Sequence, residues 1–237
     1  MKMKKIHNLY KNKRCFILAN GPSINSFDLS YLRDEITIGI NASTLLAEKY
    51  NFTQTFYTIS DKRFLDIDFK REVATRLPNE TIKVLRKEIK DIYPKEIENV
   101  LYVNALERDG FSFNLSKGYY YGCTTLMLAI QLAYFIGCKN IYILGLDLNY
   151  DSKTPRFYEE TQLQIDDSKS SVQIFNIFNA KCELEKKNVF LYNCNPNSLA
   201  RNYIPYQEYN ELFSQQQVDE NNLIKSRKNK KHSKKMI

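Results

Sequence analysis

The segment Arg14-Cys-Phe-Ile-Leu-Ala-Asn-Gly-Pro-Ser23 decides the fold. Its apolar run, from Cys15 to Ala19, has the length of a strand that is buried on both faces of a parallel sheet. The run ends in a turn, where the glycine permits backbone angles that other residues avoid, the proline fixes the chain direction and the serine can cap a helix. In α/β sheets such a turn commonly binds a nucleotide, although an ordinary strand-to-helix turn has the same pattern. It is neither a GxGxxG fingerprint nor a Walker loop.

Further apolar segments continue this pattern of strand, turn and helix. Continuous or β-branched apolar runs predict strands over 35–40, 55–60, 140–145 and 189–192, with short strands between 81 and 102. Other segments predict helices over 42–49, 61–76, 126–136, 170–187 and 206–213. Because strands alternate with helices, we expect an α/β fold: a single Rossmann-like, doubly wound domain over 14–213 with a mostly parallel sheet.

Three segments do not fit the repeating pattern. Residues 1–13 are polar and basic and predict a short, loosely held lead-in. Residues 149–169, which are polar and aromatic without periodicity, have the composition of a mobile lid. Residues 214–237 form a basic tail, which we expect to be disordered because it has little apolar surface to bury.

The net charge of +8 is concentrated in that tail, where seven basic residues lie between Lys225 and Lys235 without an acidic neighbour. The rest of the chain is nearly neutral and has no basic stripe with interleaved aromatic residues, so we expect no nucleic-acid partner. An anionic membrane surface is the partner that such a tail favours, with a purely solubilising role as the alternative. The sequence leaves the oligomeric state open.

Cysteine and histidine usage restricts the chemistry. The five cysteines are scattered and odd in number, which predicts reduced core residues of a cytoplasmic protein rather than disulfides or a metal centre. The two histidines, His7 and His232, lie in the terminal segments, so a histidine-dependent triad in the core is excluded. We see no signal peptide and no apolar run long enough to span a bilayer. The expected location is the cytoplasm, or the inner face of the cell membrane if the tail binds there.

Polar residues follow the predicted strands at the points where the strands end, at Asn20, Asn41, Ser60-Asp61 and Asp147. Each one alone is typical of a turn or a cap, but the carboxyl ends of parallel strands lie along one edge, where ligands bind. Together they predict a shared site, and replacing Asn20 by alanine should weaken nucleotide binding with little change in the melting temperature. Thr124-Thr125, before the helix at 126–136, suits either anion binding or simple capping.

Four segments together resemble two related protein families; they are residues 16–23, 38–41, 122–125 with the apolar helix that follows, and 137–147. One family is the small bacterial sialyltransferases that build surface glycans. The other is the group with an MptE-like domain, which is named for a 6-hydroxymethylpterin pyrophosphokinase and is common in surface-polysaccharide loci. The resemblance covers about 14–213 of the chain.

The sialyltransferase resemblance implies a CMP-sugar donor and residues that bind it. These are Asn20, Gly21, Pro22, Ser23, Asn41, Thr58, Ser60, Asp61, Thr124, Thr125, Gly145, Asp147, Asn149, Tyr150, Asn197 and Ser198. Thr124 and Thr125 match a Thr-Ser pair at the phosphate and the sugar, and Tyr158 matches a lid tyrosine at the leaving phosphate. Residues 194–199 resemble a Cys-Pro-Asn-Ser-Leu motif with one residue inserted, and the basic tail resembles a membrane-associating tail of that family.

The chain departs from that family at three positions. The family's catalytic histidine falls at Asp167, the arginine before its Thr-Ser pair falls at Gly122, and one lid tyrosine falls at Asn149, with Tyr150 beside it. Because a carboxylate can act as a general base, this role passes to Asp167 or Asp147. Asp167 also suits a solvated loop or the start of a helix.

The sequence therefore predicts a glycosyltransferase of bacterial surface polysaccharide or lipooligosaccharide synthesis. It would transfer a sialic-acid-like sugar from a CMP-sugar to a glycan or lipid-linked acceptor, without a metal or a cofactor. Two alternatives stay open: an MptE-like pyrophosphokinase that uses ATP and Mg²⁺, and a non-catalytic nucleotide-binding protein of glycan assembly.

Overall fold

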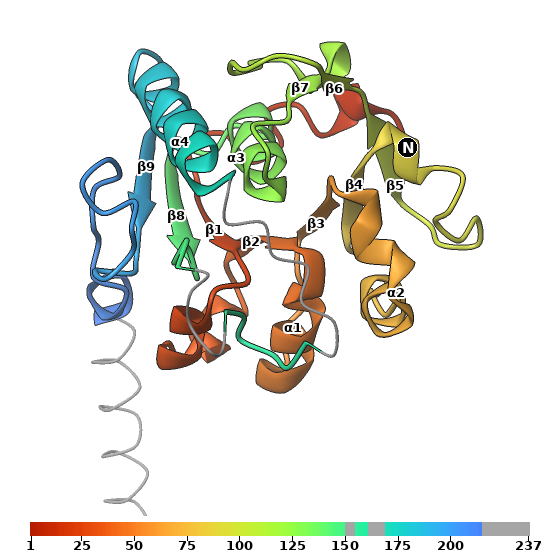
Figure 1. Cartoon of the computed structure of the whole chain (residues 1–237), viewed down its shortest axis with the longest axis horizontal. Coiled ribbons are helices and arrows are strands. Elements are labelled where there is room, and N and C mark those ends of the chain that lie inside the picture. The colour runs from red at the N-terminus through yellow and green to blue at the C-terminus, as the bar shows by residue number, and fades with distance from the viewer. Residues whose placement is uncertain (150–154, 161–168, 215–237) are drawn as a thin grey trace, which may run out of the picture. The chain divides into compact units, whose positions relative to one another are not determined.

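The computed structural model describes residues 1–149, 155–160 and 169–214. Its main sheet has seven strands in the order β5-β4-β3-β2-β1-β8-β9 (Figure 1). The strands are β1 (Arg14–Leu18), β2 (Ile36–Ile40), β3 (Phe56–Ile59), β4 (Ile82–Arg86), β5 (Val100–Val103), β8 (Asn140–Leu144) and β9 (Phe190–Asn193). All neighbouring strands in this sheet pair in parallel, which confirms the predicted α/β class and the parallel sheet.

Helices cover both faces of this sheet, as in a doubly wound fold (Figure 1). The helices α1 (Thr44–Tyr50) and α2 (Asp68–Thr75) lie on one face, and α3 (Thr125–Phe135) and α4 (Ser170–Glu185) lie on the other. Along the chain, β1 to β5 add strands on one side of β1, whereas β8 and β9 follow on the other side. The strand order therefore reverses between β1 and β8, and ligands of doubly wound sheets bind at this switch point.

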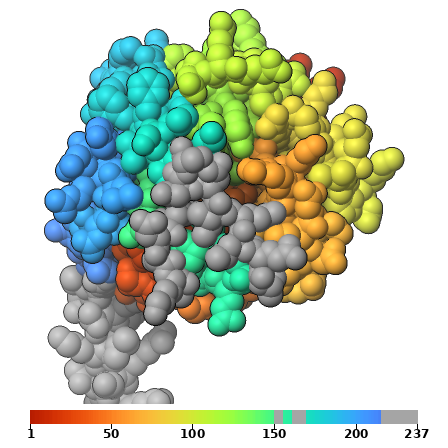
Figure 2. Space-filling view, in the orientation of Figure 1, coloured from red at the N-terminus to blue at the C-terminus, as the bar shows by residue number. Residues whose placement is uncertain are grey.

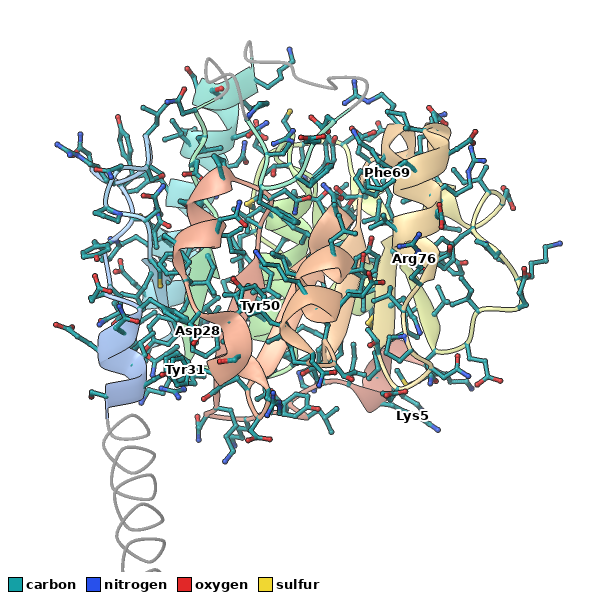
Figure 3. All side chains as sticks on the ribbon, turned by 90° about the horizontal axis from the view of Figure 1, so that it is seen from below. Lys5, Asp28, Tyr31, Tyr50, Phe69 and Arg76 are labelled. Carbon is teal, nitrogen blue, oxygen red and sulfur yellow. The ribbon has the colours of Figure 1, made fainter. Side chains whose placement is uncertain are left out.

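Figure 3 looks onto the face that carries α1 and α2. There Tyr50 of α1 donates a hydrogen bond from its hydroxyl to the Phe27 carbonyl (3.3 Å), which ties α1 to the segment after β1. That segment contains two 3₁₀ turns, η2 (Pro22–Ser26) and η3 (Leu29–Leu32), instead of an α-helix. Arg76, which follows α2, pairs with Glu72 and Glu48 and so links α2 to α1.

The helix α3 is buried on nearly every side and contacts β1, β2, β3 and α4, as its continuous apolar sequence predicts. The polar side chain of Gln131, which is completely buried in this helix, is fully hydrogen-bonded. The side-chain carbonyl of Gln131 accepts from the N–H groups of Ser112 and Tyr120 (2.9 and 3.0 Å), and its amide donates to the carbonyls of Tyr120 and Met127. Gln131 therefore attaches the 112–120 segment to the core.

The lead-in over residues 1–13 is not loosely held. The N–H groups of Asn8, Tyr10 and Asn12 donate to the carbonyls of Phe135, Ile136 and Gly137, at 2.7–3.0 Å. The last carbonyls of a helix have no partner within the helix, so this segment satisfies the end of α3. Ile6 is 1% exposed and belongs to the main core. The polar composition of the segment did not reveal this role.

The single helix predicted over 61–76 is two helices: η5 (Lys62–Asp66) and α2, separated at Ile67. The Asp61 side chain accepts from the Arg63 N–H (3.0 Å) and caps η5, and Asp68 begins α2 as an acidic first-turn residue. Shorter elements are η1 (Met3–Lys5), η4 (Asn41–Ser43), η6 (Lys87–Ile89), η7 (Leu115–Lys117), β6 (Ala105–Leu106) and β7 (Tyr119–Tyr120). The last two strands form a separate parallel pair.

The chain divides into two compact units, Met1–Gln207 and the remainder from Glu208. In the second unit a 3₁₀ turn, η9 (Asn210–Phe213), replaces the predicted helix 206–213, and Tyr209 packs against Phe213 at 5.1 Å between ring centroids. Most of the predicted lid and the basic tail, including Lys225–Lys235, lie outside the described residues. In the described part of the chain, no helix is long and apolar enough to cross a membrane. All five cysteines are free; Cys15, Cys138 and Cys194 are buried as predicted, whereas Cys123 and Cys182 are only partly buried.

Candidate functional site

A cavity of about 480 Å³ opens where β1, β2, β3 and β8 end, at the switch point of the sheet. This volume lies within the range of about 300–1,000 Å³ that is typical of small-molecule sites. Nine residues predicted from the sequence line it: Asn20, Gly21, Asn41, Asp61, Thr124, Thr125, Gly145, Asp147 and Asn149. The structure thus brings the ends of four strands and the start of α3 to one hollow. Figure 2 shows the molecule in the orientation of Figure 1, with α4 in cyan on the left and the α2 region in orange on the right.

Gly21 is required for a different reason than the sequence indicated. Its backbone angles (φ −72°, ψ 152°) are open to any residue, so the turn needs no special conformation there. A Cβ atom at Gly21, however, would lie 1.8 Å from Asp147 Oδ2 and 2.5 Å from the Gly145 carbonyl oxygen. Only glycine lets the turn after β1 approach the end of β8 so closely.

The N–H groups of this turn do not form the expected phosphate cradle. The N–H of Gly21 donates to the Gly145 carbonyl (2.9 Å), that of Ser23 to Asp147 Oδ2 (3.3 Å) and that of Ile24 to the Gly21 carbonyl (3.3 Å). Ser23 does not cap η2; its hydroxyl donates to Asp147 Oδ2 at 2.9 Å. The turn therefore positions Asp147, and an anion has to bind elsewhere in the cavity.

Asp147 joins three strand ends. Besides Ser23 after β1, its carboxylate accepts from Asn195 Nδ2, after β9, at 2.6 Å. An ionised carboxylate can accept about four hydrogen bonds, and these contacts supply three. One acceptor position is left for a hydroxyl of a ligand in the cavity that Asp147 lines.

Burial raises the pKa of Asp147 above its ordinary value of 3.8, and the hydrogen bonds from Ser23 oppose this rise. The contribution of this carboxyl to stability is therefore greatest below pH 3.8 and is lost as the pH rises through the folded-state pKa. We expect an NMR titration of the carboxyl carbon to have a midpoint above 3.8. We also expect the unfolding free energy of the wild type, relative to Asp147→Asn, to fall with rising pH across that interval. A midpoint below 3.8 would contradict this account.

Asn20 connects the ends of β1 and β2. Its Nδ2 donates to the Ile40 carbonyl (2.8 Å) and its Oδ1 accepts from the Ala42 N–H (3.1 Å), and the residue is 7% exposed. These two hydrogen bonds argue against the expectation that Asn20→Ala changes the melting temperature little. The alanine would leave two buried backbone groups unpaired, at a cost of about 1–3 kcal/mol each.

We expect Asn20→Ala to lower the unfolding free energy in urea by about 2 kcal/mol or more, from the loss of both hydrogen bonds. Asn25→Ala, in the exposed turn that follows, is the matched control and should change it by less than about 1 kcal/mol. Equal stability of the two variants would show that the Asn20 side chain does not connect the strands.

Basic side chains also line the cavity, and one of them, Arg63, pairs with Asp61 of the same lining (2.6 Å). Arg63, Arg156 and Lys169 line it, and the first residues of the 11-residue helix α3 open into it. A helix N-terminus carries a partial positive charge and favours anions. Thr124 caps α3 by accepting from the Leu126 N–H (3.3 Å), which confirms the capping alternative. This part of the cavity suits a phosphate group.

Asn41 stands out at the end of β2. Its backbone is left-handed (φ 51°), which is uncommon for a residue other than glycine, and the Tyr57 hydroxyl donates to its carbonyl. The Asn41 Oδ1 is buried and has no hydrogen-bond partner among the described residues. A buried amide oxygen without a partner costs free energy, which a ligand that donates to it would recover.

Seven predicted site residues do not line the cavity: Pro22, Ser23, Thr58, Ser60, Tyr158, Asn197 and Ser198. Thr58 and Ser60 are fully buried, and the Ser60 hydroxyl donates to Thr125 Oγ1 (2.9 Å) behind the cavity wall. From residues 194–199, it is Asn195 that reaches the site, through Asp147, whereas Ser198 Oγ accepts from the Ala200 N–H. Tyr150 and Asp167 lie outside the described residues.

The described part of the predicted lid, residues 155–160, is anchored to the segment after β1 and to α2, and one of these contacts is the hydrogen bond from Asn25 Nδ2 to the Phe157 carbonyl (3.2 Å). The Phe157 N–H donates to the Asn20 carbonyl (3.1 Å), and the Glu160 carboxylate lies 2.6 Å from Lys70 Nζ on α2. Both side chains of this ion pair are less than 5% exposed. The Tyr158 hydroxyl donates to Glu160 (3.2 Å) instead of facing the cavity. These contacts hold Pro155 and Arg156 at the cavity wall.

The sequence did not identify several residues of the site, namely Arg63, Tyr121, Cys123, Arg156, Lys169, Gln173 and Asn195. The position of Arg63, four residues after the end of β3 and two after Asp61, was a usable signal. The positions of Arg156 and Lys169 at the cavity depend on the path of the chain after β8, which no local sequence pattern shows. In the described ranges, no three His, Cys, Asp or Glu side chains are grouped so that they could hold a metal ion.

No protein-family model and no curated protein sequence matches this chain. Among solved structures it is similar to the sialyltransferase CstII from Campylobacter jejuni in complex with a substrate analogue, cytidine-5'-monophosphate. The two are 14% identical, with a TM-score of 0.51 over 83% of this chain and 85% of CstII. It is also similar to the MAf glycosyltransferase from Magnetospirillum magneticum AMB-1, at 15% identity and a TM-score of 0.51 over 79% of this chain. The match covers 33% of the MAf chain. The chain thus has a Rossmann-like fold that occurs in glycosyltransferases.

Proposed function

We propose that this protein is a glycosyltransferase that uses a nucleotide-sugar donor, with a CMP-sugar as the favoured class. The observation that carries the proposal is the cavity at the switch point, which is lined by basic side chains, by the start of α3 and by a largely buried carboxylate, Asp147. A nucleotide has a phosphate, which basic side chains bind, and ribose hydroxyls, which can donate to a carboxylate. The shared fold with two glycosyltransferases supports the reaction class.

In this proposal the phosphate binds at the N-terminus of α3, near Arg63, Arg156 and Lys169. A ribose hydroxyl donates to the remaining acceptor position of Asp147, and an amino or hydroxyl group of the nucleoside donates to Asn41 Oδ1. Asp147 is then a binding residue, because its hydrogen bonds hold it in place and occupy most of its acceptor positions. The donor sugar is expected to be sialic-acid-like and the acceptor a glycan, free or lipid-linked.

Asp167 is the residue that we propose as the general base. In the transfer, the acceptor hydroxyl oxygen bonds to the anomeric carbon, the bond from that carbon to the phosphate oxygen breaks with its electron pair on the phosphate, and the base takes the hydroxyl proton. Asp167→Asn should keep donor binding and reduce turnover by about 10²-fold or more, because an amide cannot accept that proton. Full activity of this variant would remove Asp167 from the mechanism.

The test of the function is nucleotide release, followed by liquid chromatography, when the full chain is incubated with CMP-N-acetylneuraminic acid, UDP-sugars or ATP, with and without Mg²⁺. We expect CMP release that grows when sugar acceptors are added. Release of AMP from ATP that needs Mg²⁺ and 6-hydroxymethylpterin, whose hydroxyl takes the pyrophosphoryl group, would favour the pyrophosphokinase alternative. Binding of nucleotides without any turnover would favour the non-catalytic one. The result of this test does not depend on whether the basic tail binds a membrane.

A further inference from the structure

A second, smaller cavity lies beside the first. Its volume is about 260 Å³, and Arg86, the last residue of β4, lines it. Tyr121 and Cys123 line both cavities, so the two hollows share a wall. In the sheet β4 is the neighbour of β3, where the first cavity ends, so the second cavity continues along the same edge.

Charged groups of both signs line this second cavity, among them Arg86, Glu88, Arg108 and Asp109. Arg86 donates from Nε to Glu88 Oε2 (2.7 Å) and from Nη2 to Oε1 (3.2 Å), so the pair has one fixed geometry. The hydrogen bond from Arg86 lowers the pKa of Glu88, which is therefore ionised at neutral pH. The wall thus offers charged donors and charged acceptors within a small space.

Tyr121 lines both cavities where they adjoin. The Arg86 guanidinium lies over its ring, 5.2 Å from the centroid. Burial raises the pKa of Tyr121, and the charge of Asp61 acts in the same direction while those of Arg63 and Arg86 oppose it. The phenol is therefore neutral at physiological pH and lies within the electrostatic reach of charges from both cavities.

We propose that the second cavity binds the acceptor as a saccharide unit, an inference that rests on the proposed function. A sugar hydroxyl both donates and accepts hydrogen bonds, so a hydroxyl-rich ligand can pair with guanidinium and carboxylate groups at once. An apolar ligand would desolvate these charges without pairing them, which is costly. The volume is just below the range of about 300–1,000 Å³ for whole ligands, which fits one terminal sugar better than a long chain.

This placement explains why the cavities adjoin. Direct transfer needs the acceptor hydroxyl and the donor's anomeric carbon in contact, because holding both reactants in place removes much of the entropic barrier. With the nucleotide at the switch point and the acceptor in the second cavity, the reacting groups meet near Tyr121 and Cys123, which line both cavities.

The test is saturation-transfer difference NMR on the full chain with three probes: methyl β-D-galactopyranoside, methyl β-D-glucopyranoside and methyl α-D-mannopyranoside, with and without CMP. We expect at least one glycoside to receive saturation, and CMP not to displace it. Arg108→Ala and Glu88→Gln, two exposed positions, should each reduce that signal at least fivefold. Lys87→Ala, an exposed neighbour that does not line the cavity, should leave it unchanged.

Three results would overturn the inference: no saturation of any glycoside, displacement of the glycoside by CMP, or equal signals in Arg108→Ala, Glu88→Gln and Lys87→Ala. Thermal unfolding of each variant shows whether it is folded. Glycoside binding that depends on Arg108 in a chain that fails to bind CMP would instead overturn the proposed function and keep the saccharide site.

Discussion

Replacing Gly21 by alanine should abolish nucleotide binding and lower the melting temperature by about 6–12 °C, the shift that a loss of about 3 kcal/mol causes in a chain of this size. The added Cβ would lie 1.8 Å from Asp147 Oδ2 and 2.5 Å from the Gly145 carbonyl oxygen. One of these neighbours is backbone, so rotation of a side chain cannot relieve both contacts. The turn and the end of β8 must separate, and both line the cavity.

Calorimetry with CMP and thermal unfolding measure the two effects. Ser26→Ala, an exposed change in the same turn, is the control and should change stability by less than about 1 kcal/mol. The double variant Gly21→Ala/Asp147→Ala removes the closer clash and should regain part of the lost stability without regaining binding. Wild-type affinity of Gly21→Ala would show that this close approach is not needed for the site.

Replacing Glu160 by glutamine should cost about 3–5 kcal/mol, because it removes one charge of a buried ion pair and leaves the other buried. Lys70 Nζ and Glu160 Oε1 are 2.6 Å apart, and both side chains are less than 5% exposed. The same change should weaken nucleotide binding, since residues 155–160 carry Arg156 to the cavity wall. Urea unfolding and CMP calorimetry test both effects.

Glu159→Gln is the matched control, because Glu159 is exposed on the same segment. The double variant Lys70→Met/Glu160→Leu, which removes both charges, should be close to the wild type in stability, as is common when apolar residues of similar volume replace a buried pair. If Glu160→Gln is as stable as Glu159→Gln, the ion pair does not anchor this segment.

The sheet could be predicted from the sequence because its strands are continuous apolar runs that periodicity identifies. The bounds of five strands, β1, β2, β3, β8 and β9, agree with the expected ranges to within about two residues, as is usual for such predictions. The division of 61–76 into two helices follows the cap at Asp61 and the extended backbone at Ile67 before Asp68. Both aspartates were visible in the sequence, but the segment was interpreted as one continuous helix.

The place of the candidate cavity was predicted from the sequence, and the contacts of the individual residues in it were not. Polar strand ends identified the edge of the sheet correctly, since parallel strands must end together. The close approach of Gly21 to Asp147, the bridge made by Asn20 and the Lys70–Glu160 pair join residues that are far apart in the chain. Such contacts depend on packing in three dimensions, which local sequence patterns do not contain.

The measurement that tests the central claim most directly is isothermal titration calorimetry of the full chain with CMP, UDP and ATP, each with and without Mg²⁺. The account predicts binding of CMP without Mg²⁺, with the affinity reduced at least tenfold in Arg63→Ala and unchanged in the exposed control Lys62→Ala. Tight, Mg²⁺-dependent binding of ATP together with no binding of CMP would contradict it.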